Sequence, residues 1–343
     1  MTEVVLCDQA HEERWDAYVK THPQASFYHL FGWKKINETN FGHRTFFLSA
    51  MRDQRVVGIF PLVFINSAIF GKILTSMPFV NYGGICADDW DAEKALLEKA
   101  QGITVAEGID YLEIRSIKKL EHDLPTSEQK ISMTLKLDAD PDTLWNGFRS
   151  KHRTNIRRVY KEGISVQQGG VELLDDFYNV LSESWKALGT PIYRKSYFHS
   201  LFATFGADIQ IFTANLNGNA IAVAFNAHCK GTVEGMWAGS LRKHRHLQPN
   251  YLLYWEMMKD ACEKGNLRFH LGRSTVGSGA EDFKKKWNAH PQQLYWQYYL
   301  NKSQGIPQLN VSNPKFQLAI RVWQKLPMPA TQWVGPFVSK FIP

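Results

Sequence analysis

The segment from His270 to Gly279 carries polar groups suited to binding an anion or stabilising an oxyanion. His270-Leu-Gly-Arg-Ser lies at the end of a predicted strand, and the Gly-rich sequence Thr275-Val-Gly-Ser-Gly follows it. Glycines beside a strand end let backbone N–H groups approach a negative charge. We expect Arg273 to anchor a phosphate or carboxylate and Ser274 to donate to a tetrahedral intermediate. A tight turn with a salt-bridged Arg273 is the alternative, and no GxSxG motif supports a serine nucleophile.

Three consecutive lysines, Lys284 to Lys286, follow between Phe283 and Trp287. A lysine ammonium can stabilise the oxyanion that develops when an amine attacks an ester. Either Lys284 or Lys285 is the predicted catalytic lysine. The alternative is a surface charge run beside an amphipathic segment.

Residues 148–161 are predicted to form a basic helix, because apolar residues recur there at helical spacing. Arg149, Arg153 and Arg157 lie at i, i+4 and i+8 and therefore share another face. Guanidinium groups bind phosphate with two hydrogen bonds. We expect Arg153 and Arg157 to bind the phosphate of a nucleotide-linked or lipid-linked acceptor, or of tRNA. A solvated basic face is the alternative.

The composition is that of a globular protein with a modest positive charge. The chain has 343 residues, 44% of them hydrophobic, and a net charge of +7. This length favours two domains, and the charge favours anionic ligands. The four cysteines are far apart and form no Cys/His cluster, so we expect no metal site and a reducing, cytoplasmic location. The N-terminus lacks a signal pattern, and no apolar run is long enough to span a bilayer.

The chain repeats itself at an offset of 164 residues, where residues 40–61 align with residues 204–225 without a gap. Both segments read as a helix end, a strand, a polar turn and a second strand, which is a hairpin signal. A third strand, a helix and a strand ending in Arg-Ser follow in both halves (residues 111–116 and 269–274). A domain-sized period indicates duplication.

Each half therefore reads as α+β with a mixed central sheet flanked by helices. Acyltransferases of the GNAT type have this order of elements. In that fold the central strands splay apart, and the donor sits in the gap before the following helix. The order of elements therefore resembles that of two tandem GNAT-like domains, and this resemblance gives the expected fold.

Several strings resemble Fem-type transferases, and closely those associated with the exosortase/PEP-CTERM envelope system. They cover both halves of the chain: SMPFVNYGG (76–84), FRSKHRTNIRR (148–158), LGTPIYRKSYF (188–198), PNYLLYWE (249–256), FHLGRSTVGSG (269–279) and FKKKWNAHPQQLYWQYY (283–299). The resemblance implies transfer of an aminoacyl group from aminoacyl-tRNA to an amine of a peptidoglycan precursor. It also places the Phe-Lys-Lys segment near the reaction centre. Related acyltransferases use acyl-CoA instead.

The basic loop at residues 242–250 departs from the GNAT pattern. In GNAT enzymes a Gly-rich loop at this place binds the CoA pyrophosphate at a helix N-terminus. Here the loop contains no glycine and several Arg, Lys and His residues. We expect a larger anionic donor, with Asn250 orienting a ligand. An ordinary basic loop with Asn250 as helix N-cap is the alternative.

Aromatic and polar residues are predicted to line a cleft in each half. The Fem resemblance suggests an acceptor pocket in the first half, formed by Trp33, Lys34, Asn81 and Tyr82. The second cleft would contain the aromatic residues Tyr193 and Trp237, because aromatic faces stack on sugars or bases. Packing in the core is the alternative for each of these residues.

The predicted first domain, the acceptor side, comprises residues 1–137 and 300–343, and the second, the donor and catalytic side, residues 138–299. The tail from Phe316 onward is rich in apolar residues and poor in acidic ones. We expect it to pack against the first domain. The alternative is an interfacial element that contacts inner-membrane lipid.

The sequence as a whole predicts a transferase that moves an aminoacyl or acyl group to an envelope polysaccharide or peptidoglycan-type precursor. Its co-substrate would be aminoacyl-tRNA or acyl-CoA, with no permanently bound cofactor. Two alternatives remain open. One is an acyl-CoA-dependent N- or O-acetyltransferase acting on an exopolysaccharide sugar, and the other is a nucleic-acid or glycan-binding module without turnover.

Overall fold

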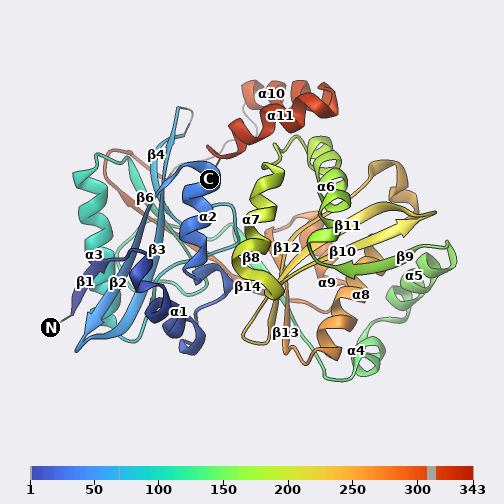
Figure 1. Ribbon diagram of the computed structural model, residues 1–343, viewed down its shortest axis with the longest axis horizontal. Coiled ribbons are helices and arrows are strands. Elements are labelled where there is room, and N and C mark those ends of the chain that lie inside the picture. Colours follow the sequence, from blue (N-terminus) through green and yellow to red (C-terminus); the bar gives the residue numbers. More distant parts are fainter. Residues whose placement is uncertain (1, 69, 307–313, 343) are drawn as a thin grey trace. The chain divides into compact units, whose positions relative to one another are not determined.

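The computed structural model describes the chain except for residues 1, 69, 307–313 and 343 (Figure 1). The chain divides into two compact units. Unit 1 comprises Met1–Ile131, Gln292–Gln308 and Lys340–Pro343, and unit 2 comprises Ser132–Pro291 and Leu309–Ser339. Among the described residues, no helix is long and apolar enough to cross a membrane.

Unit 1 is a mixed sheet flanked by helices. Its elements in chain order are β1 (Glu3–Leu6), α1 (Glu12–Thr21), α2 (Gly32–Phe41), β2 (Arg44–Arg52), β3 (Arg55–Ser67), β4 (Gly71–Ser76), β5 (Cys86–Ala87), α3 (Trp90–Ala106), β6 (Tyr111–Ser116), β7 (Thr126–Ser127) and β15 (Tyr295–Leu300). The strand order is β1-β2-β3-β4-β6-β15-β7, and β5 pairs with β3. Strand β15 reaches unit 1 from the C-terminal part of the chain and pairs with β6.

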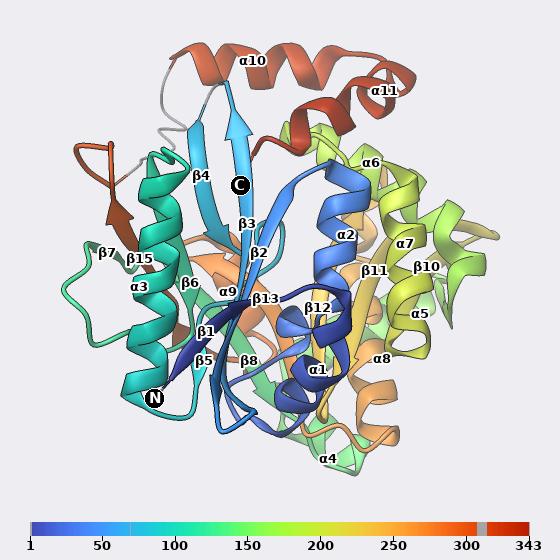
Figure 2. The ribbon, with the colours of Figure 1, turned by 60° about the vertical axis from the view of Figure 1, so that its left-hand side comes forward.

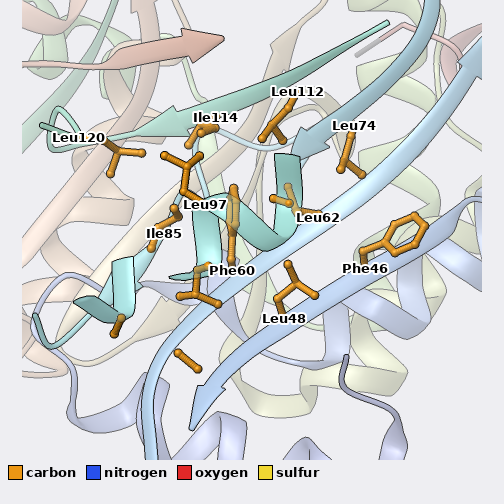
Figure 3. Close-up of a cluster of buried hydrophobic side chains, with 14 of the residues drawn as sticks. Phe46, Leu48, Phe60, Leu62, Leu74, Ile85, Leu97, Leu112, Ile114 and Leu120 are labelled. Atoms are coloured by element: carbon orange, nitrogen blue, oxygen red, sulfur yellow. The ribbon is translucent and has the colours of Figure 1, made fainter. Parts of the chain in front are cut away.

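The core of unit 1 lies between this sheet and α3. Phe60, Leu62, Leu112 and Ile114 project from the central strands, and Leu97 projects from α3 (Figure 3). Four of these five side chains are completely buried, and Leu97 is 3% exposed. The apolar residues of α3 recur at three- and four-residue spacing, which explains why this segment folds as a helix against the sheet.

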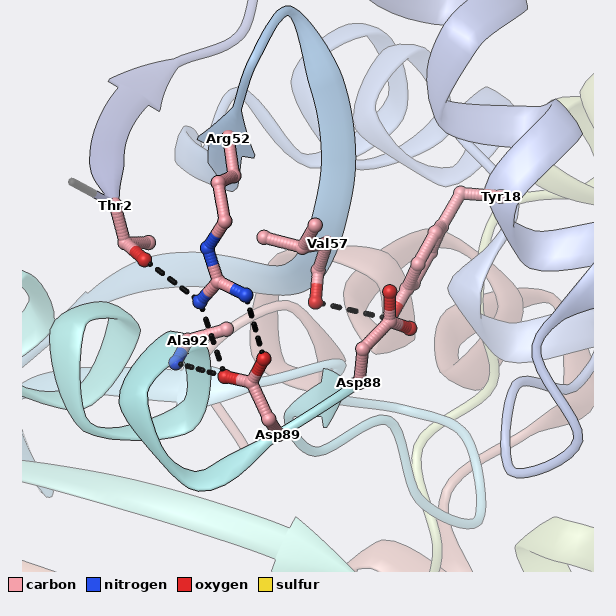
Figure 4. Close-up of polar contacts among 7 residues, drawn as sticks. All are labelled: Thr2, Tyr18, Arg52, Val57, Asp88, Asp89 and Ala92. Atoms are coloured by element: carbon pink, nitrogen blue, oxygen red, sulfur yellow. Dashed lines mark hydrogen bonds and ion pairs between the residues drawn. The ribbon is translucent and has the colours of Figure 1, made fainter.

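Polar contacts fix the start of α3 against the β2–β3 hairpin. The carboxylate of Asp89 accepts a hydrogen bond from the backbone N–H of Ala92 at 2.9 Å and forms an ion pair with Arg52 at 2.7 Å (Figure 4). It is thus both the N-cap of α3 and a tie to the hairpin. Nearby, the hydroxyl of Tyr18 on α1 donates to Asp88 at 2.9 Å.

Unit 2 contains a second mixed sheet with helices. Its elements are β8 (Lys130–Lys136), α4 (Pro141–Gly147), α5 (Ser150–Lys161), β9 (Ser165–Gly169), α6 (Leu174–Leu188), α7 (Lys195–Phe205), β10 (Ile209–Leu216), β11 (Asn219–Cys229), β12 (Thr232–Ser240), α8 (Asn250–Glu263), β13 (Arg268–Thr275), α9 (Gly279–Lys285), β14 (His290–Gln293), α10 (Pro314–Lys325) and α11 (Met328–Ser339). The strand order is β14-β8-β13-β12-β11-β10-β9.

The two halves share their elements and their irregularities. The hairpins β2–β3 and β10–β11 both turn through two residues, Asp53-Gln54 and Asn217-Gly218, with positive φ at every position. Each hairpin also has a register shift, after Ala50 and after Ala214. These alanines are 164 residues apart, which is the offset of the sequence repeat. The predicted duplication of a mixed sheet flanked by helices is confirmed.

The predicted basic helix begins later than expected. Helix α4 ends at Gly147, and Phe148 is extended with a ψ of 148°. The helix α5 therefore starts at Ser150. The apolar face of α5 is formed by His152, Ile156 and Val159, which are buried.

The tail differs from the prediction, because residues 314–339 belong to unit 2. Helices α10 and α11 pack against α6 of that unit. A Cβ at Gly189, the C-cap of α6, would come 2.5 Å from a methyl group of Ile320, and one at Gly335 would come 2.9 Å from the carbonyl oxygen of Ile192. These glycines thus allow α10 to lie close to the end of α6, and α11 to lie close to the backbone at Ile192. The prediction that this part of the tail packs on the first domain is wrong.

Candidate active site at the diverging strands of unit 2

Strands β12 and β13 run parallel but pair only where they begin. Their register extends from Thr232↔Arg268 to Glu234↔His270, whereas β12 continues to Ser240 and β13 to Thr275. Beyond the paired residues the two strands therefore diverge. Backbone groups in this divergence can bind a ligand instead of the neighbouring strand.

A buried polar network lies at the base of the divergence. The imidazole Nδ1 of His270 lies 2.6 Å from the carboxylate of Glu234 on β12. The Nε2 of His270 contacts the hydroxyl of Ser132 on β8. All three residues are at most 2% exposed. The network links three neighbouring strands and fixes the point from which β12 and β13 separate.

Helix α9 carries Lys284 into the divergence. Its ammonium donates to the carbonyl oxygens of Gly272 and Arg273, at 2.9 Å each. The side chain is 8% exposed. An ammonium has three N–H donors, so one remains for a substrate oxygen. The part of the chain that the structure describes shows no further hydrogen-bond partner for it.

Burial changes the protonation of Lys284. Desolvation lowers the pKa of its ammonium to about 8, and the positive charge of Arg273 contributes to the same direction. The side chain is therefore mainly protonated at pH 7 but titrates within one or two units of it. A pKa shifted by burial and by a like charge is typical of functional sites.

Gly272 is required for this arrangement. Its φ of +79° lies in the left-handed region, which residues with a Cβ avoid. A Cβ there would come 3.1 Å from the carbonyl oxygen of Gly235 and 3.8 Å from Nζ of Lys284. The glycine therefore leaves room for the carbonyl oxygen of Gly235 and for the ammonium of Lys284 at the start of the divergence.

The structure distinguishes the two predicted lysines. Lys285 forms an ion pair with Glu281 at 2.6 Å, and its side chain is 51% exposed. It lies on the surface of α9, whereas Lys284 points into the protein. Ser274, the predicted hydroxyl donor, is 5% exposed, and its Oγ has no hydrogen-bond partner among the described residues.

The basic residues of α5 lie close to the start of α8. The guanidinium of Arg158 donates to the side chain of Gln248 at 2.6 Å, just before α8 begins. Arg153 donates to the carbonyl oxygen of Asn146 at 2.9 Å, and Arg157 lies over the ring of Trp145 at 5.3 Å. The loop before α8 contains a 3-10 helix, η5 (Arg242–Leu247). Arg158 and the basic residues of η5 therefore lie beside the N-terminus of α8, whereas Arg153 and Arg157 lie against α4.

Asn250 is the first residue of α8, and Pro249 occupies the N-cap position. The alternative that Asn250 is the N-cap is therefore wrong. Proline has no N–H and a fixed φ, so it is well suited to a helix start. Asn250 is partly exposed there.

The predicted aromatic residues of the second cleft do meet. The rings of Tyr193 and Trp237 are 6.4 Å apart, and the ring of Trp185 is 5.4 Å from that of Tyr193. Tyr193 is 8% exposed, whereas Trp237 is partly exposed on β12. Most of this cluster is core, because the ring of Trp237 also packs against the rings of Phe198 at 5.4 Å and Phe225 at 5.3 Å.

Unit 1 has an equivalent divergence between β4 and β6, but a loop of the chain closes it. Strands β4 and β6 pair from Ile73↔Tyr111 to Thr75↔Glu113. Beyond this point the carbonyl oxygen of Arg115 accepts a hydrogen bond from the backbone N–H of Gly83 at 3.0 Å. In unit 2 the equivalent carbonyl, that of Arg273, accepts from Lys284.

The loop carrying Gly83 and Gly84 fills the space between β4 and β6. A Cβ at Gly84 would come 2.0 Å from the Oγ of Ser116. The hydrogen bond from Gly83 to Arg115 thus closes this divergence with the backbone of the loop.

Arg115 of unit 1, the counterpart of Arg273, is neutralised. Its guanidinium pairs with Glu113 at 2.7 Å and lies over the ring of Trp296 at 4.4 Å. It is 1% exposed. The two halves therefore share a fold, but only the divergence in unit 2 combines a buried ammonium with a second cation.

The predicted acceptor residues of unit 1 have different environments. Trp33 is 1% exposed, and its indole N–H donates to the carbonyl oxygen of Phe27 at 3.0 Å, so the structure places it in the core and not in a cleft. Lys34 is partly buried and pairs with Glu38. Asn81 donates to the hydroxyl of Tyr28 at 2.7 Å, and the ring of Tyr82 packs edge-on against the ring of Tyr28.

Sequence reasoning missed Glu234, Ser132 and Asn226. Glu234 interrupts an otherwise apolar strand, and a charged residue in such a strand indicates a buried polar role. This signal is visible in the sequence. Asn226 lies at the register shift of β11, is 1% exposed, and has an Oδ1 without a hydrogen-bond partner among the described residues. Its position depends on a bulge that sequence patterns do not reveal.

Comparison with known proteins agrees with this geometry. The model of the acetyltransferase (GNAT) domain family matches residues 147–285, which include the divergence and Lys284. The solved structure of FemX has the same fold, with a TM-score of 0.68, 17% identity, and coverage of 93% of this chain and 100% of that chain.

Two curated relatives are peptidoglycan-precursor transferases by name. UDP-N-acetylmuramoylpentapeptide-lysine N(6)-alanyltransferase of Weissella viridescens is 27% identical over 43% of this chain and 45% of the relative. Lipid II:glycine glycyltransferase of Staphylococcus aureus is 22% identical over 63% of this chain and 56% of the relative. The matched parts thus span about half the length of these relatives. The resemblance to the exosortase-associated branch stays a prediction. The chain has tandem GNAT-like domains, and it is similar to Fem-type transferases.

Proposed function

We propose that this protein transfers an aminoacyl or acyl group to an amine of a peptidoglycan-type or other envelope glycan precursor. The observation that carries the proposal is the buried ammonium of Lys284 between the diverging strands of unit 2. The names of the two curated relatives support the same class of reaction.

In the proposed reaction the acceptor amine attacks the ester carbonyl of the donor. A new C–N bond forms, the C–O bond to the donor breaks, and the amine proton passes to the departing oxygen. The carbonyl oxygen is negatively charged in the transition state. The third N–H of Lys284 stabilises that charge, with Arg273 and the hydroxyl of Ser274 nearby in the chain. Positioning of the two substrates supplies most of the remaining rate enhancement.

The basic surface around α8 favours aminoacyl-tRNA as the donor. The loop at residues 242–250 lacks glycine, and Gln248 has a φ of +54° where a glycine would be unstrained. Arg153, Arg157 and Arg158 add positive charge from α5. These features suit the phosphates of a large anionic donor.

An acyl-CoA-dependent acetyltransferase acting on the N or O atom of a glycan sugar is the second candidate. The GNAT domain match over residues 147–285 favours it, because the donor would occupy the same divergence. If the donor is a thioester, the attack on the carbonyl is the same, and the C–S bond breaks in place of the C–O bond. Calorimetric titration with acetyl-CoA separates the candidates, since micromolar binding supports the acetyltransferase.

The proposed acceptor is linked to a nucleotide or to a lipid. Asn81 and Lys34 of unit 1 remain its predicted contacts there. Such precursors and aminoacyl-tRNA meet in the cytoplasm, so we place the reaction at the inner face of the cytoplasmic membrane.

Mass spectrometry of envelope precursors tests the proposal. Extracts from cells with and without the protein are compared, and cells carrying Lys284→Met provide the matched comparison. We expect an aminoacyl or acyl mass increment that is present only with the unaltered protein. Identical precursor masses in all three strains would show that the substrate class is wrong.

A further inference from the structure

We propose that helices α10 and α11 form a docking surface for an anionic lipid bilayer. The inference deepens the proposed function and rests on it only for the choice of the inner leaflet. Its basis is the face of these two helices that points away from α6 and the rest of unit 2.

One face of each helix packs against the rest of unit 2. On α10 the side chain of Gln324 donates to the carbonyl oxygen of Ala187 at 3.0 Å. On α11 the residues Thr331, Gly335 and Ser339 are buried. Both helices contact α6, and Figure 2 shows α11 turning back below α10. These contacts fix which faces are left to solvent.

The opposite face of α11 is aromatic. Trp333 is 73% exposed and Phe337 is 47% exposed, and their ring centroids lie 5.9 Å apart. Among the large hydrophobic side chains that the structure describes, Trp333 is the most exposed. Exposed tryptophan and phenylalanine on one face of a helix are typical of elements that insert at a membrane interface.

The opposite face of α10 combines apolar and basic residues. Leu318 is 62% exposed and Val322 is 53% exposed. Arg321 and Lys325 are also exposed, and the spacing of three and four residues places all four side chains on one side of the helix. Both helices have 12 residues, which gives a length of roughly 18 Å. This length suits a helix lying in the interface plane.

The charge of the two helices favours an anionic surface as the occupant. Helices α10 and α11 contain no aspartate or glutamate, and α10 carries the exposed cations Arg321 and Lys325. Just before α7, the guanidinium of Arg194 lies over the ring of Phe337 at 5.0 Å. Exposed apolar residues beside cations complement anionic lipid headgroups above an acyl layer.

Flotation with lipid vesicles tests the inference. The full chain is mixed with vesicles of phosphatidylcholine alone or with 30% phosphatidylglycerol, without donor or acceptor. We expect binding to the anionic vesicles, a drop of about tenfold in partitioning for Trp333→Ala, and loss of the preference for anionic lipid in Arg321→Gln/Lys325→Gln. Because Trp333 is largely exposed, its replacement should leave the circular dichroism melting curve unchanged.

Trp90→Ala is the matched control, because Trp90 of unit 1 is also a tryptophan that is 54% exposed. This variant should bind vesicles like the unaltered protein. No binding to anionic vesicles, or equal losses for Trp90→Ala and Trp333→Ala, would overturn the inference. So would a dimer in light scattering that Trp333→Ala dissociates, because the face would then bind a second copy. Transfer to a water-soluble precursor is measured separately, so failure of the proposed function is distinguishable.

Discussion

Lys284 and Lys285 are neighbours in the sequence but have opposite environments. The first is buried and bonded to two carbonyl oxygens, and the second is exposed and paired with Glu281. The sequence predicted that one of these two lysines is catalytic. It did not indicate which, because the direction of each side chain depends on where the short helix α9 begins.

The lysines make a matched pair of variants. Removing a donor that stabilises an oxyanion lowers kcat by roughly 10²–10³-fold in known cases, so Lys284→Met should do the same. Lys285→Met should stay within about twofold, since it removes only an exposed ion pair. Single-turnover transfer rates measure both. Equal losses in the two variants would contradict the assignment.

The pH dependence follows from the lowered pKa of Lys284. Its pKa is about 8, so the ammonium that stabilises the oxyanion is present below this pH and lost above it. We expect a falling limb of kcat near pH 8. In Lys284→Arg the guanidinium stays protonated, so any residual activity should lack this limb. A kcat that rises without a falling limb up to pH 10 in the unaltered protein would show that the charge is not needed.

Among the secondary-structure elements, the hairpins and the repeat were predictable from the sequence. Turn residues and strand patterns located β2–β3 and β10–β11, and the fixed offset related them. The divergence of β12 and β13 was expected only through the resemblance to a known fold. The closure of the equivalent site in unit 1 was not predicted, because it depends on close packing between Gly84 and Ser116, which are distant in sequence.

Gly272 tests whether the geometry of β13 matters. Gly272→Ala would place a Cβ in the left-handed region beside Gly235, at a cost of about 1–2 kcal/mol in the free energy of unfolding. It should also lower the transfer rate by shifting Lys284. Gly279→Ala is the control, because a Cβ there meets no atom within 4 Å. Urea unfolding and transfer rates give both readouts, and indistinguishable variants would refute the role of Gly272.

Gly84 tests the closure of the first divergence. Gly84→Ala should destabilise the protein by about 1–3 kcal/mol, because the new methyl group would overlap the hydroxyl of Ser116. Gly102→Ala, on the exposed side of α3, should instead stabilise it by about 0.5–1 kcal/mol. Thermal or urea unfolding measures the difference. A neutral Gly84→Ala would mean that the loop can leave its place between β4 and β6.

For the molecule as a whole, composition and charge favoured an anionic ligand without naming one. The excess of positive charge is most evident near α8, in α5 and in η5. Whether this surface binds tRNA depends on the arrangement of many side chains, which sequence patterns do not define. The tail was misplaced for a related reason. Its apolar residues predict packing but do not identify the partner.

Salt dependence tests the basic surface. If the donor is tRNA, its affinity should fall steeply with rising salt. Arg153→Gln/Arg157→Gln should weaken binding and reduce the slope of log Kd against log salt by about 1–2. Lys259→Gln is the control on α8, because Lys259 lies near Glu263 at the other end of that helix. An unchanged slope in the double variant would exclude the face of α5 from the donor site.

The central claim is that unit 2 moves an activated carbonyl from a donor to an amine. The most direct measurement follows label from aminoacyl-tRNA into a peptidoglycan precursor, using the unaltered protein and Lys284→Met. An amide survives alkaline treatment, whereas the aminoacyl ester hydrolyses. We expect alkali-stable label on the precursor with the unaltered protein and at least a hundredfold less with Lys284→Met. If label reaches the precursor equally fast with both proteins, the account is contradicted. It is also contradicted if the unaltered protein transfers no label to the precursor from either aminoacyl-tRNA or acetyl-CoA.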